Sequence, residues 1–561
     1  MLTRIVLNKN INNLRKWLIA LELMLLALYS NAQQISRLPN KPKLVIGIVV
    51  DQMRYDYLFR YSDKFNSNGF AKLLKNGFIF RNAQYPYVPT YTGPGHAAIY
   101  TGATPSNNGI IANDWYERSL NKSVYVTEDT TVQGVGGSGK ESQMSPRRLL
   151  STTVTDELRL ATNKKSKVIG IALKDRGSIL PAGHIPNAAY WYDSQSGNWI
   201  TSDYYMGDLP KWVKYFNEQK LADKYLSKPW ITLYDISTYT NGLPNGAPYR
   251  NAYKGEAENR FPHNLPALIE ANGYELLKKT PFGNSMTLDF AIAAIKAENL
   301  GKNQNTDFLA ISFSSTDYVG HQFGIQSIEV QDTYARLDKE LERLLAFIDQ
   351  YIGAENVLLF LTADHGAVET PAYMQSMNIP GGIFKSKGIK KELNNHISSL
   401  FGDGKWILDY ENLQFYLNTQ LAKEKKVNIA EIENACITFL QSREGVYKVY
   451  SSEALSITAN DYYNTALKKG LHPLRSGNIA IQLLPGWFDA DYAATGGTTH
   501  GSGYSYDTHV PLIWYGWKVK AGSSGDKVSI TDIAPTVADI LNISYPNGTN
   551  GSVLSDIFLH K

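Results

Sequence analysis

Apolar residues occur along the chain in short unbroken runs, and longer segments with helical periodicity separate these runs. An unbroken apolar run is typical of a strand that is covered on both faces. Such runs predict strands at residues 43–50, 167–173, 307–314, 356–362 and 509–515. The periodic segments predict helices at residues 147–161, 285–300, 329–352 and 531–541. This alternation predicts an α/β fold with a mostly parallel sheet between two layers of helices.

Two regions depart from this alternation. Residues from about 195 to 280 are rich in Tyr, Trp, Asn, Gly and Pro, and residues from about 370 to 495 contain their own helical and strand patterns. A chain of 561 residues is long enough for several domains. Neither region begins with a flexible linker, however. We therefore predict a single catalytic domain, residues 33–561, that carries both regions as inserted caps.

The first 32 residues have the features of an export signal. Basic residues precede an apolar run of 13 residues, Trp17–Tyr29, and the small residues Ser30 and Ala32 follow at the positions that a signal peptidase reads. The run is short for a bilayer span, so an uncleaved anchor or a buried helix is the weaker alternative. We predict a signal peptide at residues 1–32, export to the periplasm or the medium, and no membrane partner.

Charge and cysteine content exclude several classes of protein. The net charge is +4, and removal of residues 1–32, which hold four basic residues and one acidic residue, leaves +1. A nearly neutral protein has no global electrostatic attraction to nucleic acid, so no nucleic-acid partner is expected. Cys436 is the single cysteine, which excludes a disulfide framework, a cysteine-ligated zinc site and an iron–sulfur cluster.

Carboxylates and histidines lie at the ends of the predicted strands. Ligands bind beyond the carboxyl ends of parallel strands, so these side chains are expected to meet at one edge of the sheet. They are Asp51, Asp317, His321, Asp364 and His365 after three strands, and His500 before the last strand. Each of them alone could be a turn residue or a helix cap. Together they exceed what one catalytic zinc needs and suit two divalent ions.

A candidate nucleophile lies in the segment PTYTGPGHAAIYTG, residues 89–102. Thr92 stands where a loop enters a predicted helix, and free N–H groups and the helix dipole favour an anion at that point. Coordination to a metal would make its hydroxyl a competent nucleophile. The alternative is that Thr92 only caps the helix. His96 and His184 could either pack in the interior or reach the site.

Seven segments occur in the order IVVDQMR, PTYTGPGH, ANDWY, LKDRG, STDYVGHQFG, TADHG and TTHG. Over nearly the whole mature chain they resemble the alkaline phosphatase superfamily, specifically the phosphate-irrepressible bacterial alkaline phosphatases of the PafA type. The resemblance implies an alkaline-phosphatase-like fold, two zinc ions and a threonine nucleophile. It assigns Asp51, Asp364 and His365 to one zinc, with Thr92 coordinated to it. It assigns Asp317, His321 and His500 to the other zinc.

The resemblance also implies that Asn113 hydrogen-bonds a phosphoryl oxygen. Lys174 and Arg176 follow the strand at 167–173 directly, and in an extended segment both would face the site while Asp175 points away. A phosphate monoester carries more charge than a diester and exposes three oxygens, so two added cations favour the monoester.

We therefore expect an exported, metal-dependent alkaline phosphatase that hydrolyses small-molecule phosphate monoesters through a phosphothreonine intermediate. The sequence does not indicate an oligomeric state. The first alternative is a phosphodiesterase or nucleotide pyrophosphatase on the same fold. The alternative from another class is a non-catalytic exported glycan-binding protein, for which the aromatic stretch Tyr190–Trp230 is the support.

Overall fold

The computed structural model describes residues 41–457, 461–490 and 496–558. The predicted signal peptide lies outside the described residues. Among the residues that are described, no helix combines the length and the apolar character that crossing a bilayer requires.

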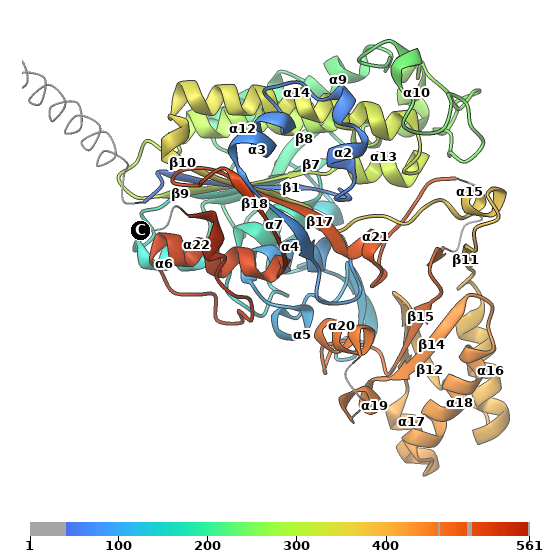
Figure 1. The fold of residues 1–561 in the computed structure, drawn as a ribbon. Helices are drawn as coiled ribbons and strands as arrows, with labels where there is room; N and C mark the ends of the chain where they lie inside the picture. Colours follow the sequence, from blue (N-terminus) through green and yellow to red (C-terminus); the bar gives the residue numbers. More distant parts are fainter. Residues whose placement is uncertain (1–40, 458–460, 491–495, 559–561) are drawn as a thin grey trace, which may run out of the picture.

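A ten-stranded sheet forms the centre of the molecule, in the order β18-β2-β17-β10-β1-β9-β6-β7-β8-β5 (Figure 1). The five central strands run parallel and are β10 (Val357–Thr362), β1 (Leu44–Val50), β9 (Asp307–Phe313), β6 (Val168–Ala172) and β7 (Ala188–Asp193). The flanking strands are β17 (His509–Gly516), β2 (Phe78–Gln84), β18 (Gly522–Ser529), β8 (Asn198–Ser202) and β5 (Gly134–Val135). β17 is antiparallel to both of its neighbours, β10 and β2. The predicted mostly parallel sheet is confirmed.

Helices cover both faces of this sheet (Figure 1). One face carries α12 (Phe282–Ala297), α13 (Ser315–Phe323) and α14 (Ile328–Tyr351). The other face carries α4 (Thr92–Thr101), α6 (Val154–Ala161), α7 (Asp175–Ala182) and α22 (Ile533–Leu541). The shorter main-body elements are α2 (Tyr57–Arg60), α3 (Phe70–Asn76), α5 (Pro105–Asn108), β3 (Asp114–Glu117), β4 (Lys122–Tyr125) and α21 (Ser505–Thr508).

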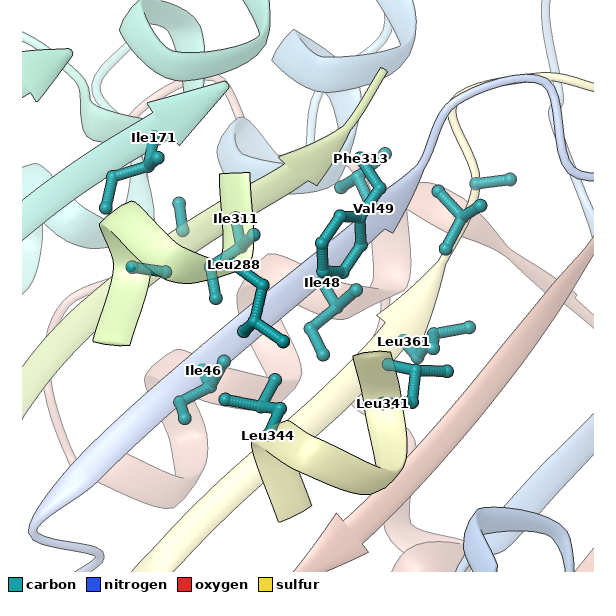
Figure 2. Packing of buried hydrophobic residues seen from close by; sticks show 14 of the residues in the cluster. Ile46, Ile48, Val49, Ile171, Leu288, Ile311, Phe313, Leu341, Leu344 and Leu361 are labelled. Atoms are coloured by element: carbon teal, nitrogen blue, oxygen red, sulfur yellow. The ribbon is translucent and has the colours of Figure 1, made fainter. Parts of the chain in front are cut away.

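The main hydrophobic core covers both faces of the sheet, and one half of it lies between the parallel strands and the helices α12 and α14. Every residue of β1 is buried, as the unbroken apolar run of this strand predicts. Figure 2 shows Leu344 of α14 and Leu288 of α12 packed over β1, near Ile46 and Ile48, and Leu341 of α14 beside Leu361 of β10. Each such side chain contributes about 1.5–3 kcal/mol by leaving water. This packing makes the central strands a rigid base for the loops at their ends.

The aromatic residues of the first inserted region belong to the core. Trp199 and Trp230 of this region, and Trp191 in β7 just before it, are each at most 2% exposed. Trp199 stacks on Phe290 of α12 with ring centroids 4.4 Å apart. The helices of this region are α8 (Lys211–Glu218), α9 (Leu221–Leu226), α10 (Leu265–Asn272) and α11 (Glu275–Lys278). The aromatic stretch Tyr190–Trp230 therefore packs the interior for the most part, and it gives no support to the glycan-binding alternative.

The second inserted region builds a lobe with its own hydrophobic cluster, drawn in orange in Figure 1. Its sheet has the order β12 (Ile407–Glu411), β13 (Gln414–Leu417), β15 (Ile479–Leu483) and β14 (Val446–Ser451). Its other elements are α15 (Pro371–Ser376), β11 (Gly382–Phe384), α16 (Ile389–Phe401), α17 (Thr419–Lys425), α18 (Ile429–Gln441), α19 (Ser452–Ile457), α20 (Tyr462–Gly470) and β16 (Trp487–Asp489). The β12–β13 turn reaches the main body, where Asn412 Nδ2 donates to the Asp114 carbonyl oxygen at 2.7 Å.

The predicted helix 147–161 begins at Val154, seven residues later than expected. A capping box explains the start: the Thr153 hydroxyl accepts from the Asp156 N–H, and the Asp156 carboxylate accepts from the Thr153 N–H, both at 3.0 Å. Asp156 also binds His184, whose Nδ1 lies 2.9 Å from Asp156 Oδ2. His184 thus joins the end of α7 to the start of α6 and has a structural role.

His184 makes one part of the stability dependent on pH. Burial lowers the pKa of His184, but the hydrogen bond and the charge of Asp156 outweigh it and raise the pKa above its ordinary value. A histidine whose folded-state pKa is raised stabilises the fold fully below its unfolded-state pKa, and this contribution is lost as the pH rises through the folded-state value.

We expect His184→Gln to lower the free energy of unfolding by about 1 kcal/mol at acidic pH, near 5.5, and by less near pH 8.5. Glutamine keeps the polar side chain but cannot acquire the positive charge that Asp156 binds. Urea unfolding of both proteins across this range measures the difference. A difference that is independent of pH, or that grows with rising pH, would contradict the assignment.

Candidate functional site

The predicted carboxylates lie at one edge of the central sheet. β1 pairs in parallel with both β9 and β10, so the three strands end at the same edge. Asp51 directly follows β1, and Asp364 follows β10 after one intervening residue. Asp317 lies in the first turn of α13, which follows β9. All three side chains are buried.

His500 reaches this edge because β17 runs against the direction of β10. Leu512, in the first half of β17, pairs with Thr362, the last residue of β10. The start of β17 therefore lies beside the end of β10, and the segment that leads into β17 brings His500 to the carboxylates. His500 Nε2 is 3.7 Å from Asp317 Oδ1.

The described residues contain two groups of potential metal ligands, in each of which the ligand atoms all lie within 4.8 Å of one another. The first group is Asp51, Asp364 and His365, and the second is Asp317, His365 and His500. The expected set of Asp317, His321 and His500 differs from the second group, because His365 takes the place of His321. His321 nevertheless lies beside this group, with its Nε2 3.1 Å from Asp317 Oδ1.

Backbone carbonyl groups fix the orientation of all three imidazoles. His321 Nδ1 lies 2.7 Å from the Thr498 carbonyl oxygen. His365 Nδ1 lies 3.0 Å from the Gly366 carbonyl oxygen, and His500 Nδ1 lies 2.7 Å from the Thr90 carbonyl oxygen. A carbonyl oxygen only accepts, so each Nδ1 carries a proton and donates it. In the neutral ring, Nε2 then presents a lone pair to the site, which is the form that binds a metal ion.

These lone pairs face carboxylate oxygens, which also only accept. His365 Nε2 is 3.5 Å from Asp51 Oδ1 and 3.6 Å from Asp364 Oδ2. Both of these oxygens are buried and accept no hydrogen bond from any described residue. Acceptors that face each other at such distances require a proton or a cation between them. The residues therefore fit a divalent ion that takes nitrogen and oxygen ligands, such as zinc.

The electrostatics of the site lead to the same conclusion. Burial raises the pKa of Asp51 to about 6, although the attraction of Lys174 lowers it in part. Burial and the charge of Asp51 raise the pKa of Asp364 well above its ordinary value. Lys174 Nζ lies 2.6 Å from both Asp51 Oδ2 and Asp317 Oδ2. Against the effect of burial, the charge of Asp317 also raises the pKa of His321, so the three buried carboxylates draw positive charge to the site.

Thr92 is the first residue of α4, and its side chain points to the ligands. Its Oγ1 lies 3.4 Å from His365 Nε2 and accepts a hydrogen bond from Lys174 Nζ at 3.3 Å. The residue before the helix is Tyr91, and no side chain caps this end of the helix, so Thr92 does not act as a cap. A Cβ on Gly95 would lie 2.5 Å from the Asp364 carbonyl oxygen. Only glycine at this position lets α4 approach the backbone of Asp364 this closely.

Lys174 and Arg176 are arranged differently from the expectation. Lys174 precedes α7 and Asp175 is the first residue of this helix, so the assumption of an extended segment is wrong. Arg176 Nη1 donates to the Tyr125 hydroxyl at 2.8 Å, and the same hydroxyl donates to Asp175 Oδ1 at 2.9 Å. Arg176 Nε is buried and has no hydrogen-bond partner among the described residues. This N–H group is thus a buried donor that can bind a ligand.

Asn113 is tied to the residue next to Thr92. Its Oδ1 accepts from the Gly93 N–H at 2.8 Å, which leaves the Nδ2 group as a donor for another partner. His96, one turn into α4, has Nδ1 2.9 Å from the Thr92 carbonyl oxygen and Nε2 2.9 Å from Ser312 Oγ. His96 therefore joins α4 to β9.

Sequence reasoning missed two residues of the site. Tyr125 hydrogen-bonds Arg176 and Asp175, but it lies in the hairpin strand β4, and no sequence motif there identifies it as a site residue. Gln52 stands next to Asp51 in the segment IVVDQMR and could have been found there. Its side-chain Nε2 donates to Asp317 Oδ1 at 2.7 Å.

The fold places a buried cluster of potential metal ligands beside the Thr92 hydroxyl, at the carboxyl ends of parallel strands. Residues 45–504 match the family model of type I phosphodiesterases and nucleotide pyrophosphatases. Because this match covers most of the chain, the protein belongs to this family.

Several relatives resemble the chain over nearly its whole length. A protein named calcium-transporting ATPase from Myroides odoratus is 48% identical, over 94% of this chain and 97% of its own. Alkaline phosphatase PhoV from Synechococcus elongatus is 44% identical, over 92% and 93%. Alkaline phosphatase PafA from Elizabethkingia meningoseptica is 41% identical, over 97% and 99%. A crystal structure of wild-type PafA matches with a TM-score of 0.89, over 92% of this chain and 99% of that chain. The resemblance to PafA-type alkaline phosphatases and the fold that it implies are confirmed.

Proposed function

We propose that the protein is an exported, metal-dependent alkaline phosphatase that hydrolyses small-molecule phosphate monoesters through a phosphothreonine intermediate on Thr92. The chain is a phosphoric monoester hydrolase, as its similarity to the alkaline phosphatases PafA and PhoV over nearly its whole length indicates. The metal, its number, the covalent intermediate and the export are the parts that this proposal adds.

One observation carries the metal dependence. Three imidazoles with their Nδ1 protons committed to backbone carbonyl groups direct their lone pairs at buried carboxylates. Asp51, Asp364 and His365 would hold one zinc ion, and Asp317 and His500 would hold the other with His321 beside them. Two such ions supply Lewis-acid stabilisation of the charge that develops on the phosphoryl group and on the attacking and leaving oxygens.

The residues of the chain provide positioning and charge. Thr92 Oγ1 bonds to phosphorus as the bond to the departing alcohol breaks, and water then hydrolyses the phosphothreonine. Lys174, 3.3 Å from this oxygen, favours its deprotonated form. The Asn113 amide and the Arg176 guanidinium donate to the non-bridging oxygens, where charge gathers in the transition state.

This arrangement favours a monoester over a diester. A monoester offers three free oxygens to Lys174, Asn113 and Arg176, whereas a diester has a neutral substituent on one of them. A phosphodiesterase on this fold would use the same metal ligands and Thr92. The two functions are therefore distinguished by how much Arg176 contributes to the hydrolysis of a monoester and of a diester. Arg176 is the better test residue, because Lys174 also contacts the proposed metal ligands Asp51 and Asp317.

We expect chelation to abolish phosphatase activity and zinc to restore it, with close to two ions per chain by elemental analysis. His365→Ala should lower the metal content and abolish nearly all activity, since His365 belongs to both ligand groups. His184→Gln, which changes a histidine outside the site, should keep both ions. Undiminished turnover of a fully metal-stripped protein would contradict the proposal.

Thr92→Ala should lose covalent labelling by a phosphate ester and reduce kcat/KM by roughly a thousandfold or more, because no hydroxyl remains to attack. Thr92→Ser keeps a hydroxyl and should retain part of the activity. Thr101→Ala, at the other end of α4, is the control and should still be labelled. With a substrate chiral at phosphorus, two successive displacements give net retention. Net inversion would show direct attack by water.

Arg176→Ala should reduce kcat/KM for an aryl phosphate monoester about ten- to a hundredfold, which is the effect of losing one charge-assisted hydrogen bond in a closed site. Hydrolysis of the corresponding diester should fall much less. Tyr125→Phe is the matched control: it frees the guanidinium but keeps its charge, so its effect should be smaller. Equal losses on monoester and diester in Arg176→Ala would instead favour the phosphodiesterase alternative.

A further inference from the structure

Gln52 donates hydrogen bonds to a carboxylate in each of the two ligand groups, and unlike Lys174, which contacts Asp51 and Asp317, it does so without a charge. Its backbone N–H donates to Asp364 Oδ1 at 3.1 Å. Its side-chain Nε2 donates to Asp317 Oδ1 at 2.7 Å. Gln52 is only 3% exposed, so water does not compete for these contacts. A single residue thus bridges the carboxyl ends of β9 and β10 across the end of β1.

The local backbone is arranged around this side chain at a conformational cost. Gln52 has φ 61°, in the left-handed region that residues other than glycine, asparagine and aspartate seldom adopt. Opposite it in α13 stands Gly320, where a Cβ would lie 1.9 Å from Gln52 Oε1. Glycine inside a helix is unfavourable, and here it leaves room for the amide. The positive φ of Gln52 and the glycine at position 320 are both unfavourable, and both allow the Gln52 amide to reach Asp317. This indicates that the position of the Gln52 amide matters.

The amide also determines how Asp317 is oriented. Asp317 Oδ1 accepts from Gln52, and Asp317 Oδ2 contacts Lys174 at 2.6 Å. With both oxygens held, the plane of the carboxylate is fixed relative to His321 and His500. A neutral amide achieves this without adding a positive charge, which would repel a bound cation. Hydrogen-bond partners of this kind tune the affinity of metal ligands.

We propose that Gln52 is a positioning residue for the metal ligands, which orients Asp317 through its side-chain amide and Asp364 through its backbone N–H. This inference rests on the proposed two-metal function. Loss of the side-chain amide weakens metal binding at the Asp317 group first, since the backbone N–H to Asp364 remains in every variant.

The experiment compares Gln52→Met and Gln52→Gly with the wild type by competition with a zinc chelator and by steady-state kinetics. Methionine keeps the length of the side chain without its amide. Glycine removes the side chain and relieves the positive φ, so its folding is not in question. Gln331→Met is the control, because the Gln331 amide is buried on α14 and its Nε2 has no hydrogen-bond partner among the described residues.

We expect both Gln52 variants to bind one of two zinc ions about 10- to 100-fold more weakly and the other with nearly wild-type affinity. Their kcat/KM should recover as the free zinc concentration is raised, while Gln331→Met should match the wild type throughout. A merely structural role would lower the unfolding midpoint of the metal-free protein and would not be rescued by zinc.

Two outcomes overturn the inference in distinguishable ways. Wild-type affinity for both ions in Gln52→Met and Gln52→Gly would show that the amide does not position the ligands, while the two-metal function stands. A wild-type protein that binds no divalent ion would refute the proposed function itself and this inference with it.

Discussion

The burial of three carboxylates at one edge of the sheet is the constraint on which the site depends. Asp51, Asp317 and Asp364 lie out of contact with water, where ionised carboxylates are costly unless cations compensate them. Lys174 supplies one positive charge in direct contact. The remaining negative charge, together with imidazole lone pairs that face the same oxygens, makes the edge stable as an ionised cluster only with further cations.

The rest of the main body serves to hold this edge in place. The three parallel strands are anchored by a core that leaves their ends no freedom to separate (Figure 2). The backbone approaches of α4 and α13 depend on Gly95 and Gly320, where any side chain would collide with the loops after β10 and β1. Thr92 and the three histidines are positioned by carbonyl groups and helix starts rather than by flexible side chains, so the reactive groups are pre-organised.

The inserted regions divide into an interior part and a lobe. The first region packs most of its tryptophan and tyrosine into the main core, which is why its aromatic content is no sign of a carbohydrate-binding surface. The lobe has a separate hydrophobic cluster and touches the main body through the β12–β13 turn at Asp114. Asp114 is next to Asn113, so the lobe meets the main body beside the residues proposed to bind the phosphoryl group.

The sequence by itself determined the layered α/β fold and pointed to the candidate ligand residues, because unbroken apolar runs mark buried strands and polar residues at strand ends mark a ligand-binding edge. It could not place the start of α6, which a capping box decides, or the conformation of Lys174 and Arg176, because a helix begins between them. Local pattern also carries no information about strand direction. Only the antiparallel pairing of β17 with β10 brings His500 to the carboxylates. The tautomers of His321 and His500 and the bridge made by Gln52 likewise depend on contacts between segments more than 170 residues apart, and such contacts exist only once the chain has folded.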